Sequence, residues 1–141
     1  MSFKIFLSDV FRQLFIRRHK SMEFRGKVFA AMLLAKKTQS DEDYEIINEL
    51  ASEIYPNDQK CIELLNSTVK EYVGKAKNYK NLNLDSLLNE IDKDLKTHKR
   101  LIKKIDFSHL RRLICDDDTD ALIQQRVYEF FVSEVKSYSQ I

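Results

Sequence analysis

Residues 40–56 read SDEDYEIINELASEIYP and carry the signals of a complete amphipathic helix. Ser40 can cap the helix start, and Asp43 stands at the third helical position, where its carboxylate can complete a capping box. Acidic residues in the first turn also suit the positive end of the helix dipole. Pro56 cannot continue a helix, so the element is predicted to end just before it. The predicted apolar face consists of Tyr44, Ile47, Leu50, Ala51 and Ile54.

The same helical spacing of apolar residues recurs along the chain. Its longest stripe alternates steps of four and three residues, which predicts one long packed helix over residues 84–105. Two glycines and one proline are too few for a turn-rich β architecture. We therefore predict an all-α chain, a single bundle of six to seven helices. The other predicted helices cover residues 2–17, 22–37 (with a stripe through Phe24, Val28 and Ala31), 57–76, 108–115 and 119–138 (with Ile123, Val127 and Phe131 inward).

The composition is that of one globular domain. Of the 141 residues, 43% are hydrophobic and 33% are charged, and a chain of this length can bury a core without disulfides. Residues 1–20 are predicted to form an amphipathic basic N-terminal helix, and residues 21–141 the helical bundle. Cys61 and Cys115 follow helical patterns and are predicted to be buried thiols rather than a disulfide.

Two features of the sequence bear on localisation. No apolar run approaches the ~18 residues that span a bilayer. Asp9 and Arg12 interrupt the N-terminal apolar region, and no small-residue cleavage site follows it, unlike in a signal peptide. The sequence therefore predicts a cytoplasmic protein and leaves open a position at the inner face of the membrane.

The net charge of +2 hides a segregation into blocks. Residues 4–37 and 93–112 are basic, whereas residues 41–63 and 116–134 are acidic. Such blocks can pair helices within the fold or face partners. No nucleic-acid-binding motif frames the second basic block, so a solvated surface or pairing with the acidic helix is favoured over nucleic acid. Its cations are Lys93, Lys96, Lys99, Arg100, Lys103, Lys104, Arg111 and Arg112.

The search for catalytic residues points away from an enzyme. His19, His98 and His109 lie in three different segments, and the chain has no glycine-rich phosphate loop or nucleophile elbow. His98 occupies a position on an apolar stripe, which favours a core or interface histidine.

The run from Asp116 to Asp120 is the most concentrated group of carboxylates in the chain. Carboxylate oxygens are ligands for Ca²⁺ or Mg²⁺. A calcium-binding loop is not matched, because Ala121 replaces the required glycine and Val127 replaces the bidentate glutamate. The alternative is that these acids stabilise a helix start, with Asp118 or Thr119 as its cap.

The acidic helix starts at residues 40–43 and 116–120 are similar to each other. Each follows an apolar helix end and a short polar turn that contains a hydroxyl group. On Ser40, Glu42, Asp117 and Thr119, the chain resembles the tellurite-resistance TerB-like domain, which also occurs in the N-terminal part of a membrane-anchored DnaJ-type co-chaperone. The resemblance covers residues 22–135 and implies a helical bundle, a link to stress and metal binding by acidic turns. The candidate ligands for Ca²⁺ or Mg²⁺ are Glu42, Asp116, Asp117, Asp118 and Asp120.

The N-terminal segment joins aromatic residues to a cluster of cations. Such a combination is typical of a helix at an anionic membrane surface. The alternative is that the segment packs on the bundle with its basic end in solvent. The candidate contact residues are Phe3, Phe6, Phe11, Phe15, Arg17, Arg18 and Lys20.

From these patterns we predict a non-enzymatic interaction or adaptor domain with an unidentified protein partner, and with a link to stress. A divalent-cation-binding domain is the first alternative, and a peripheral membrane module is the second. An oligomer formed through the helix at residues 84–105 also remains open.

Overall fold

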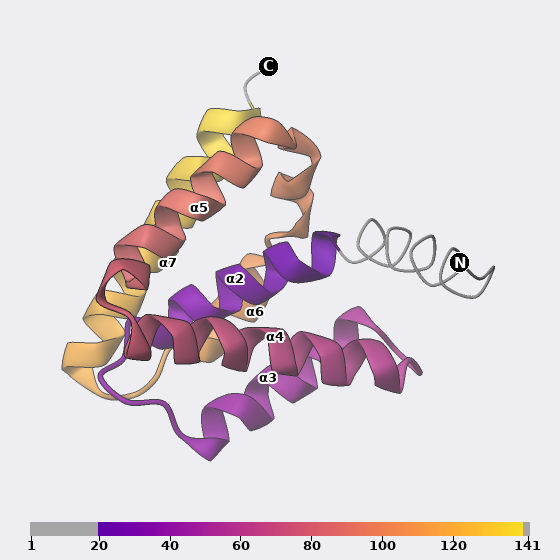
Figure 1. Ribbon diagram of the computed structural model, residues 1–141, viewed down its shortest axis with the longest axis vertical. Helices are drawn as coiled ribbons and strands as arrows, with labels where there is room; N and C mark the ends of the chain where they lie inside the picture. The colour runs from indigo at the N-terminus through magenta and orange to yellow at the C-terminus, as the bar shows by residue number, and fades with distance from the viewer. Residues whose placement is uncertain (1–19, 140–141) are drawn as a thin grey trace, which may run out of the picture.

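The computed structural model describes residues 20–139 and is helical throughout that range, with no strand among the described residues (Figure 1). The all-α prediction is therefore confirmed, whereas the predicted N-terminal helix lies outside the described residues. The elements are α2 (Lys20–Leu34), α3 (Asp41–Ile54), α4 (Gln59–Asn78), the 3₁₀ helix η1 (Lys80–Leu82), α5 (Leu84–Thr97), the 3₁₀ helix η2 (Lys99–Lys104), α6 (Phe107–Leu113) and α7 (Asp118–Ser139).

Helix α2 forms the centre of the fold. It contacts α4, α5, α6, α7 and η2, and it lies between the α3–α4 pair and the α5–α7 pair (Figure 1). Every residue from 26 to 33 is buried, as expected for a helix that other elements surround. The predicted stripe through Phe24 and Val28 was therefore too narrow, since Phe29 and Leu33 on other faces are buried as well.

Gly26 allows α2 and α4 to approach each other closely. A Cβ atom at this position would lie 2.6 Å from the Cγ2 atom of Thr68 on α4, a separation at which carbon atoms repel. Gly74, within α4, has no heavy atom within 4 Å of the equivalent position. The packing therefore requires a glycine at position 26 but not at position 74.

The predicted helix starts are confirmed at three positions. In the capping box of α3, the Ser40 hydroxyl accepts from the Asp43 amide at 3.4 Å, and Asp43 Oδ2 accepts from the Ser40 amide at 2.9 Å. Lys36 Nζ donates to the buried Asp43 carboxylate at 2.7 Å, which ties the preceding turn to the helix. At the starts of α4 and α5, the Asp58 side chain accepts from the Cys61 amide and the Asn83 side chain from the Ser86 amide.

The prediction of one long helix over residues 84–105 is wrong, because α5 ends at Thr97. His98 leaves the helical conformation, with φ −134° and ψ 80°, and η2 follows it. Leu101 is 1% exposed, and η2 contacts both α2 and α7. A continuous helix would have turned Leu101 away from the stripe that contains Leu95. The break therefore allows a further apolar side chain to enter the core.

The start of α7 also differs from the prediction. Ile123, predicted to face inward, is 38% exposed, and Gln124 is fully buried beside it. Asp117 caps the helix in place of Asp118 or Thr119, because its Oδ1 atom accepts from the Asp120 amide at 2.9 Å. Farther along the helix, Val127 and Phe131 are buried as predicted.

Candidate functional site

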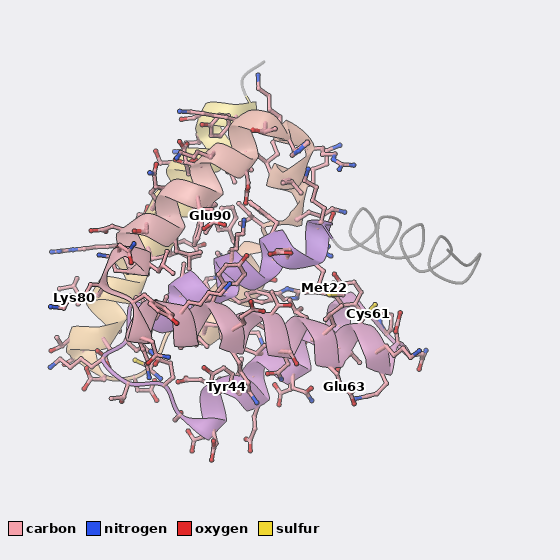
Figure 2. The ribbon with its side chains drawn as sticks, in the orientation of Figure 1. Met22, Tyr44, Cys61, Glu63, Lys80 and Glu90 are labelled. Atoms are coloured by element: carbon pink, nitrogen blue, oxygen red, sulfur yellow. The ribbon has the colours of Figure 1, made fainter. Side chains whose placement is uncertain are left out.

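A buried lysine joins the central helix to α5. Lys27 Nζ lies 2.7 Å from Asp94 Oδ2 and 2.8 Å from Glu90 Oε1, and Glu90 projects from α5 in Figure 2. Burial lowers the pKa of Lys27, but the hydrogen bonds to Asp94 and Glu90 outweigh it and hold the pKa above its ordinary value. The ammonium is therefore charged at neutral pH. The sequence analysis did not single out Lys27, which stands within an apolar stretch.

Tyr72 lies beside this lysine. Its hydroxyl donates to Glu23 Oε1 at 2.6 Å, and Lys27 Nζ is 5.9 Å from its ring centroid. Burial and then the hydrogen bond to Glu23 raise the pKa of Tyr72, so the phenol remains protonated at neutral pH. The group therefore acts as a hydrogen-bond donor between α4 and α2.

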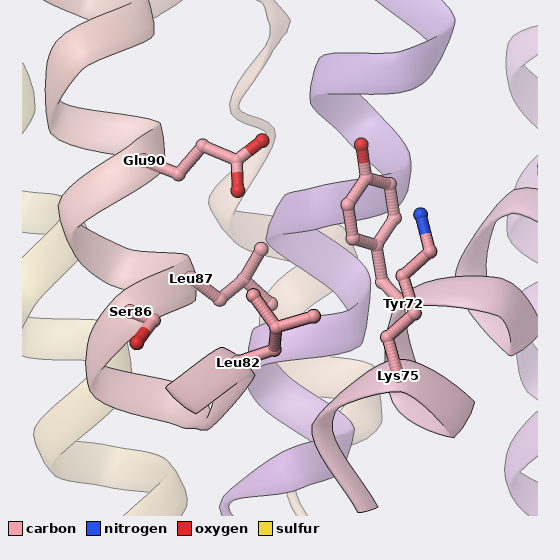
Figure 3. A pocket seen from close by; sticks show the side chains of 6 residues that line it. All are labelled: Tyr72, Lys75, Leu82, Ser86, Leu87 and Glu90. Atoms are coloured by element: carbon pink, nitrogen blue, oxygen red, sulfur yellow. The ribbon is translucent and has the colours of Figure 1, made fainter. Parts of the chain in front are cut away.

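A small pocket opens between α4, η1 and α5 (Figure 3). Its volume is about 160 Å³, and the Ser86 hydroxyl at its edge donates to the Asn81 carbonyl at 2.8 Å. No histidine or cysteine is among the lining residues, so the pocket offers a serine without an adjacent histidine base. The lining residues are Tyr72, Lys75, Leu82, Ser86, Leu87 and Glu90.

The η2 helix forms a cationic surface next to the start of α2. Lys20 Nζ contacts His98 Nε2, which brings the first residue of α2 to the junction of α5 and η2. In η2, Lys99, Arg100 and Lys103 are exposed and Lys104 is half-buried. We call Lys20, Lys99, Arg100, Lys103 and Lys104 the basic end.

Asp92 and Asp94, the two acids of α5 that are nearest in sequence to η2, have other partners. Asp94 binds Lys27 at 2.7 Å, and Asp92 lies 3.4 Å from Lys96. Within residues 20–139, no η2 cation forms a salt bridge. The basic end therefore carries a concentrated positive charge that the described part of the fold does not neutralise.

In contrast to the η2 cations, basic residues of α6 pair with acidic residues. Arg112 of α6 binds Glu53 and also Glu49, the latter at 3.1 Å, both on α3. His109 Nε2 lies 3.6 Å from the Glu53 carboxylate and from that of Asp106. The predicted pairing of basic residues with the acidic helix is confirmed for Arg112, and the predicted solvated surface is confirmed for the exposed cations of η2.

The two acidic turns approach each other without forming a metal cage. The Lys37 amide donates to Asp120 Oδ1 at 3.2 Å, which links the turn after α2 to the start of α7. Glu42 and the residues 116–118 are exposed. Across the described residues, no group of three or more His, Cys, Asp or Glu side chains is placed to hold a metal ion. Binding of Ca²⁺ or Mg²⁺ at these turns therefore stays a prediction, which the geometry does not support.

Gln124 holds three chain segments together from within the core. Its Nε2 atom donates to the carbonyls of Met32 at 3.1 Å and Leu113 at 2.8 Å, and its Oε1 atom accepts from the Cys115 amide at 2.9 Å. These bonds satisfy backbone groups at the ends of α2 and α6. The available sequence signal was the core spacing of Gln124 with Val127 and Phe131.

A carboxylate pair lies at the far end of the α5–α7 contact. The Tyr138 hydroxyl donates to Asp92 Oδ1 at 2.6 Å, and this bond holds the pKa of Asp92 below its ordinary value. Burial, and then the neighbouring Asp92, raise the pKa of Glu134 to about 7. Glu134 therefore takes up its proton at a higher pH than an ordinary glutamate does.

Most of the predicted contact residues lie outside the described range. Phe3, Phe6, Phe11, Phe15, Arg17 and Arg18 precede it, and Lys20 is the first residue of α2. Among residues 20–139, no helix is both long and apolar enough to cross a bilayer. Cys61 and Cys115 are half-buried and form no disulfide, so the buried position predicted for these thiols is only partly reached.

Comparison with models of known protein families, with curated proteins and with solved structures finds no match for this chain. The resemblance to the TerB-like family and the link to stress therefore stay predictions. The possibility of an oligomer through residues 84–105 is also untested, although Leu87, Ile91 and Leu95 of α5 are buried within the chain's own core.

Proposed function

We propose that this chain is a non-enzymatic interaction module that binds an anionic partner through its basic end. The observation that carries the proposal is the contact between Lys20 and His98. It brings Lys20, the first residue of α2, next to η2, whose cations are far from it in the sequence. Because no acid among residues 20–139 pairs with the η2 cations, their charge is available to a partner.

The pocket supports the non-enzymatic part of the proposal. Its serine donates to a backbone carbonyl, and its charged side chains, Lys75 and Glu90, are already engaged. Lys75 lies 3.0 Å from Glu71, and Glu90 lies 2.8 Å from Lys27. The first contact lies within α4, and the second joins α5 to α2.

Retention of the full chain on immobilised heparin, a polyanion, tests the proposal. We expect the triple variant Lys99→Glu, Arg100→Glu and Lys103→Glu to elute at much lower salt than the wild type. A matched control reverses the exposed cations Lys60, Lys77 and Lys80, which lie elsewhere on the surface. The control has the same net charge, so equal losses in both variants would overturn the proposal. Far-UV circular dichroism establishes that each variant is folded.

A further inference from the structure

We propose that two copies of this chain bind each other, the start of α7 in one copy docking on the α4–α5 connection of the other. An exposed apolar side chain of α7 enters the pocket between α4, η1 and α5, and acids of one copy face lysines of the other. The inference goes beyond the proposed function, because neither surface includes the basic end. It depends on where apolar side chains are exposed, on the pocket beside one group of them, and on the charges that flank both groups.

The large apolar side chains that are exposed among residues 20–139 form two groups. Tyr79 and Leu82, in the α4–α5 connection, are 57% and 42% exposed. Leu122 and Ile123, in the first turns of α7, are 56% and 38% exposed. Single exposed apolar residues are ordinary on a protein surface, but these four lie in pairs at only two places. Covering either pair with a partner surface removes apolar area from water.

The first group borders the pocket, which has a volume of about 160 Å³. Leu82, Leu87 and the ring of Tyr72 provide its apolar lining (Figure 3). An apolar cavity of about 150 Å³ holds a molecule as large as benzene, so the pocket has room for one aliphatic side chain. Leu122 is the more exposed member of the α7 pair and has a side chain of that kind.

The charges that flank the two groups are opposite. Residues 72–84 include three lysines and no acid, whereas residues 116–125 include four aspartates and no cation. Lys77 and Lys80 are exposed and form no salt bridge within the described part of the chain. We call the first group the lysine surface, which consists of Lys77, Tyr79, Lys80 and Leu82. We call the second group the aspartate surface, which consists of Asp116, Asp118, Leu122 and Ile123.

The two surfaces fit each other better than either fits itself. Asp118 and Leu122 are four residues apart in α7 and therefore lie on one face of the helix. Lys80 and Leu82 are both exposed within the three residues of η1. Each surface thus presents apolar and charged groups together, and contact between two identical surfaces would oppose like charges. Because the chain itself carries both complementary surfaces, the partner that they indicate is a second copy.

Sedimentation of the full chain over a range of concentrations tests the inference. We expect the average mass to rise above that of one chain as the concentration increases. Leu122→Ser should weaken self-association by at least about tenfold, because a leucine side chain is no longer buried in the contact. The double variant Lys77→Glu with Lys80→Glu should weaken it as well, because aspartates would then face glutamates.

A mixture of the two variants separates this contact from other modes of association. Leu122→Ser retains an intact lysine surface, and the double lysine variant retains an intact aspartate surface. One contact of wild-type composition can therefore form between them, and an equimolar mixture should associate more strongly than either variant alone. Far-UV circular dichroism establishes that each variant is folded.

The control is the triple variant Lys99→Glu, Arg100→Glu and Lys103→Glu, which reverses more charge than the double lysine variant does. It should self-associate as the wild type does while it loses retention on heparin, so that this inference and the proposed function fail separately. A chain that stays monomeric at every concentration would overturn the inference. It would also be overturned by association that both surface variants leave unchanged, or by a mixture that associates no better than its components.

Discussion

The contact between α2 and α4 gives the sharpest prediction, the effect of Gly26→Ala. The new Cβ atom would lie 2.6 Å from Thr68 Cγ2 and 3.2 Å from Thr68 Cβ. Thr68 is branched at Cβ, and its hydroxyl donates to the Leu64 carbonyl at 2.8 Å. A change of its rotamer would disturb that bond, so relief costs either this hydrogen bond or a shift of the two helices.

The magnitude follows from two opposing effects. Inserting a methyl group into a well-packed contact costs about 1–3 kcal/mol. Alanine is better than glycine in a helix interior by about 1 kcal/mol. Because Gly26 lies in the central helix, a shift there disturbs contacts with several elements. We therefore expect Gly26→Ala to lower the free energy of unfolding by about 1–2 kcal/mol.

Gly74→Ala supplies the matched control. The same substitution in a helix with open space around the new atom should raise the free energy of unfolding by about 0.5–1 kcal/mol. Urea unfolding followed by far-UV circular dichroism measures both changes.

A double-mutant cycle with Thr68→Ser isolates the steric contact, because serine lacks the Cγ2 methyl group and keeps the hydroxyl. Gly26→Ala should be at least about 1 kcal/mol less destabilising in the Thr68→Ser background. The reasoning would be refuted if Gly26→Ala stabilised the protein as Gly74→Ala does, or if the two changes were additive.

Two further predictions concern polar groups within the fold. Gln124→Met should lower the free energy of unfolding by about 3 kcal/mol, because it leaves buried backbone groups at three chain segments without partners. The same change at the exposed Gln125 is the control, and urea titrations showing equal effects would contradict the role of the buried amide. Glu134→Gln should remove a pH dependence of stability. With the pKa of Glu134 raised to about 7 from 4.5, protonation stabilises the folded state; the contribution is fully present below about 4.5 and is lost as the pH rises through about 7. Thermal unfolding from pH 4 to pH 8 should show the wild type losing stability relative to the variant, and a constant difference would contradict the shift in pKa.

The basic block at residues 93–112 shows how one run of charge is divided by the fold. Arg112 binds the acidic helix α3, whereas Lys99, Arg100 and Lys103 remain exposed. The sequence places all these cations in one block, but the break at His98 separates α5 from the η2 segment that carries the exposed group. The proposed interaction surface depends on that break.

The sequence by itself determined the features that local interactions control. The all-α class, the capping box at Ser40 and Asp43, and the starts of α4 and α5 near residues 57 and 84 were predicted and are confirmed. A cap is made by groups about three residues apart, and a helical stripe repeats every three or four residues, so both are visible within a short window.

Only the tertiary structure decided features in which distant segments compete for space or for hydrogen-bond partners. The end of α5 at Thr97 follows from the burial of Leu101 against α2 and α7. The charge on Lys27 is stabilised by Asp94, which lies in another helix. The inward position of Gln124, in place of Ile123, follows from the unpaired carbonyls at the ends of α2 and α6. These outcomes depend on which helices become neighbours, and periodicity along a single segment carries no information about its neighbours.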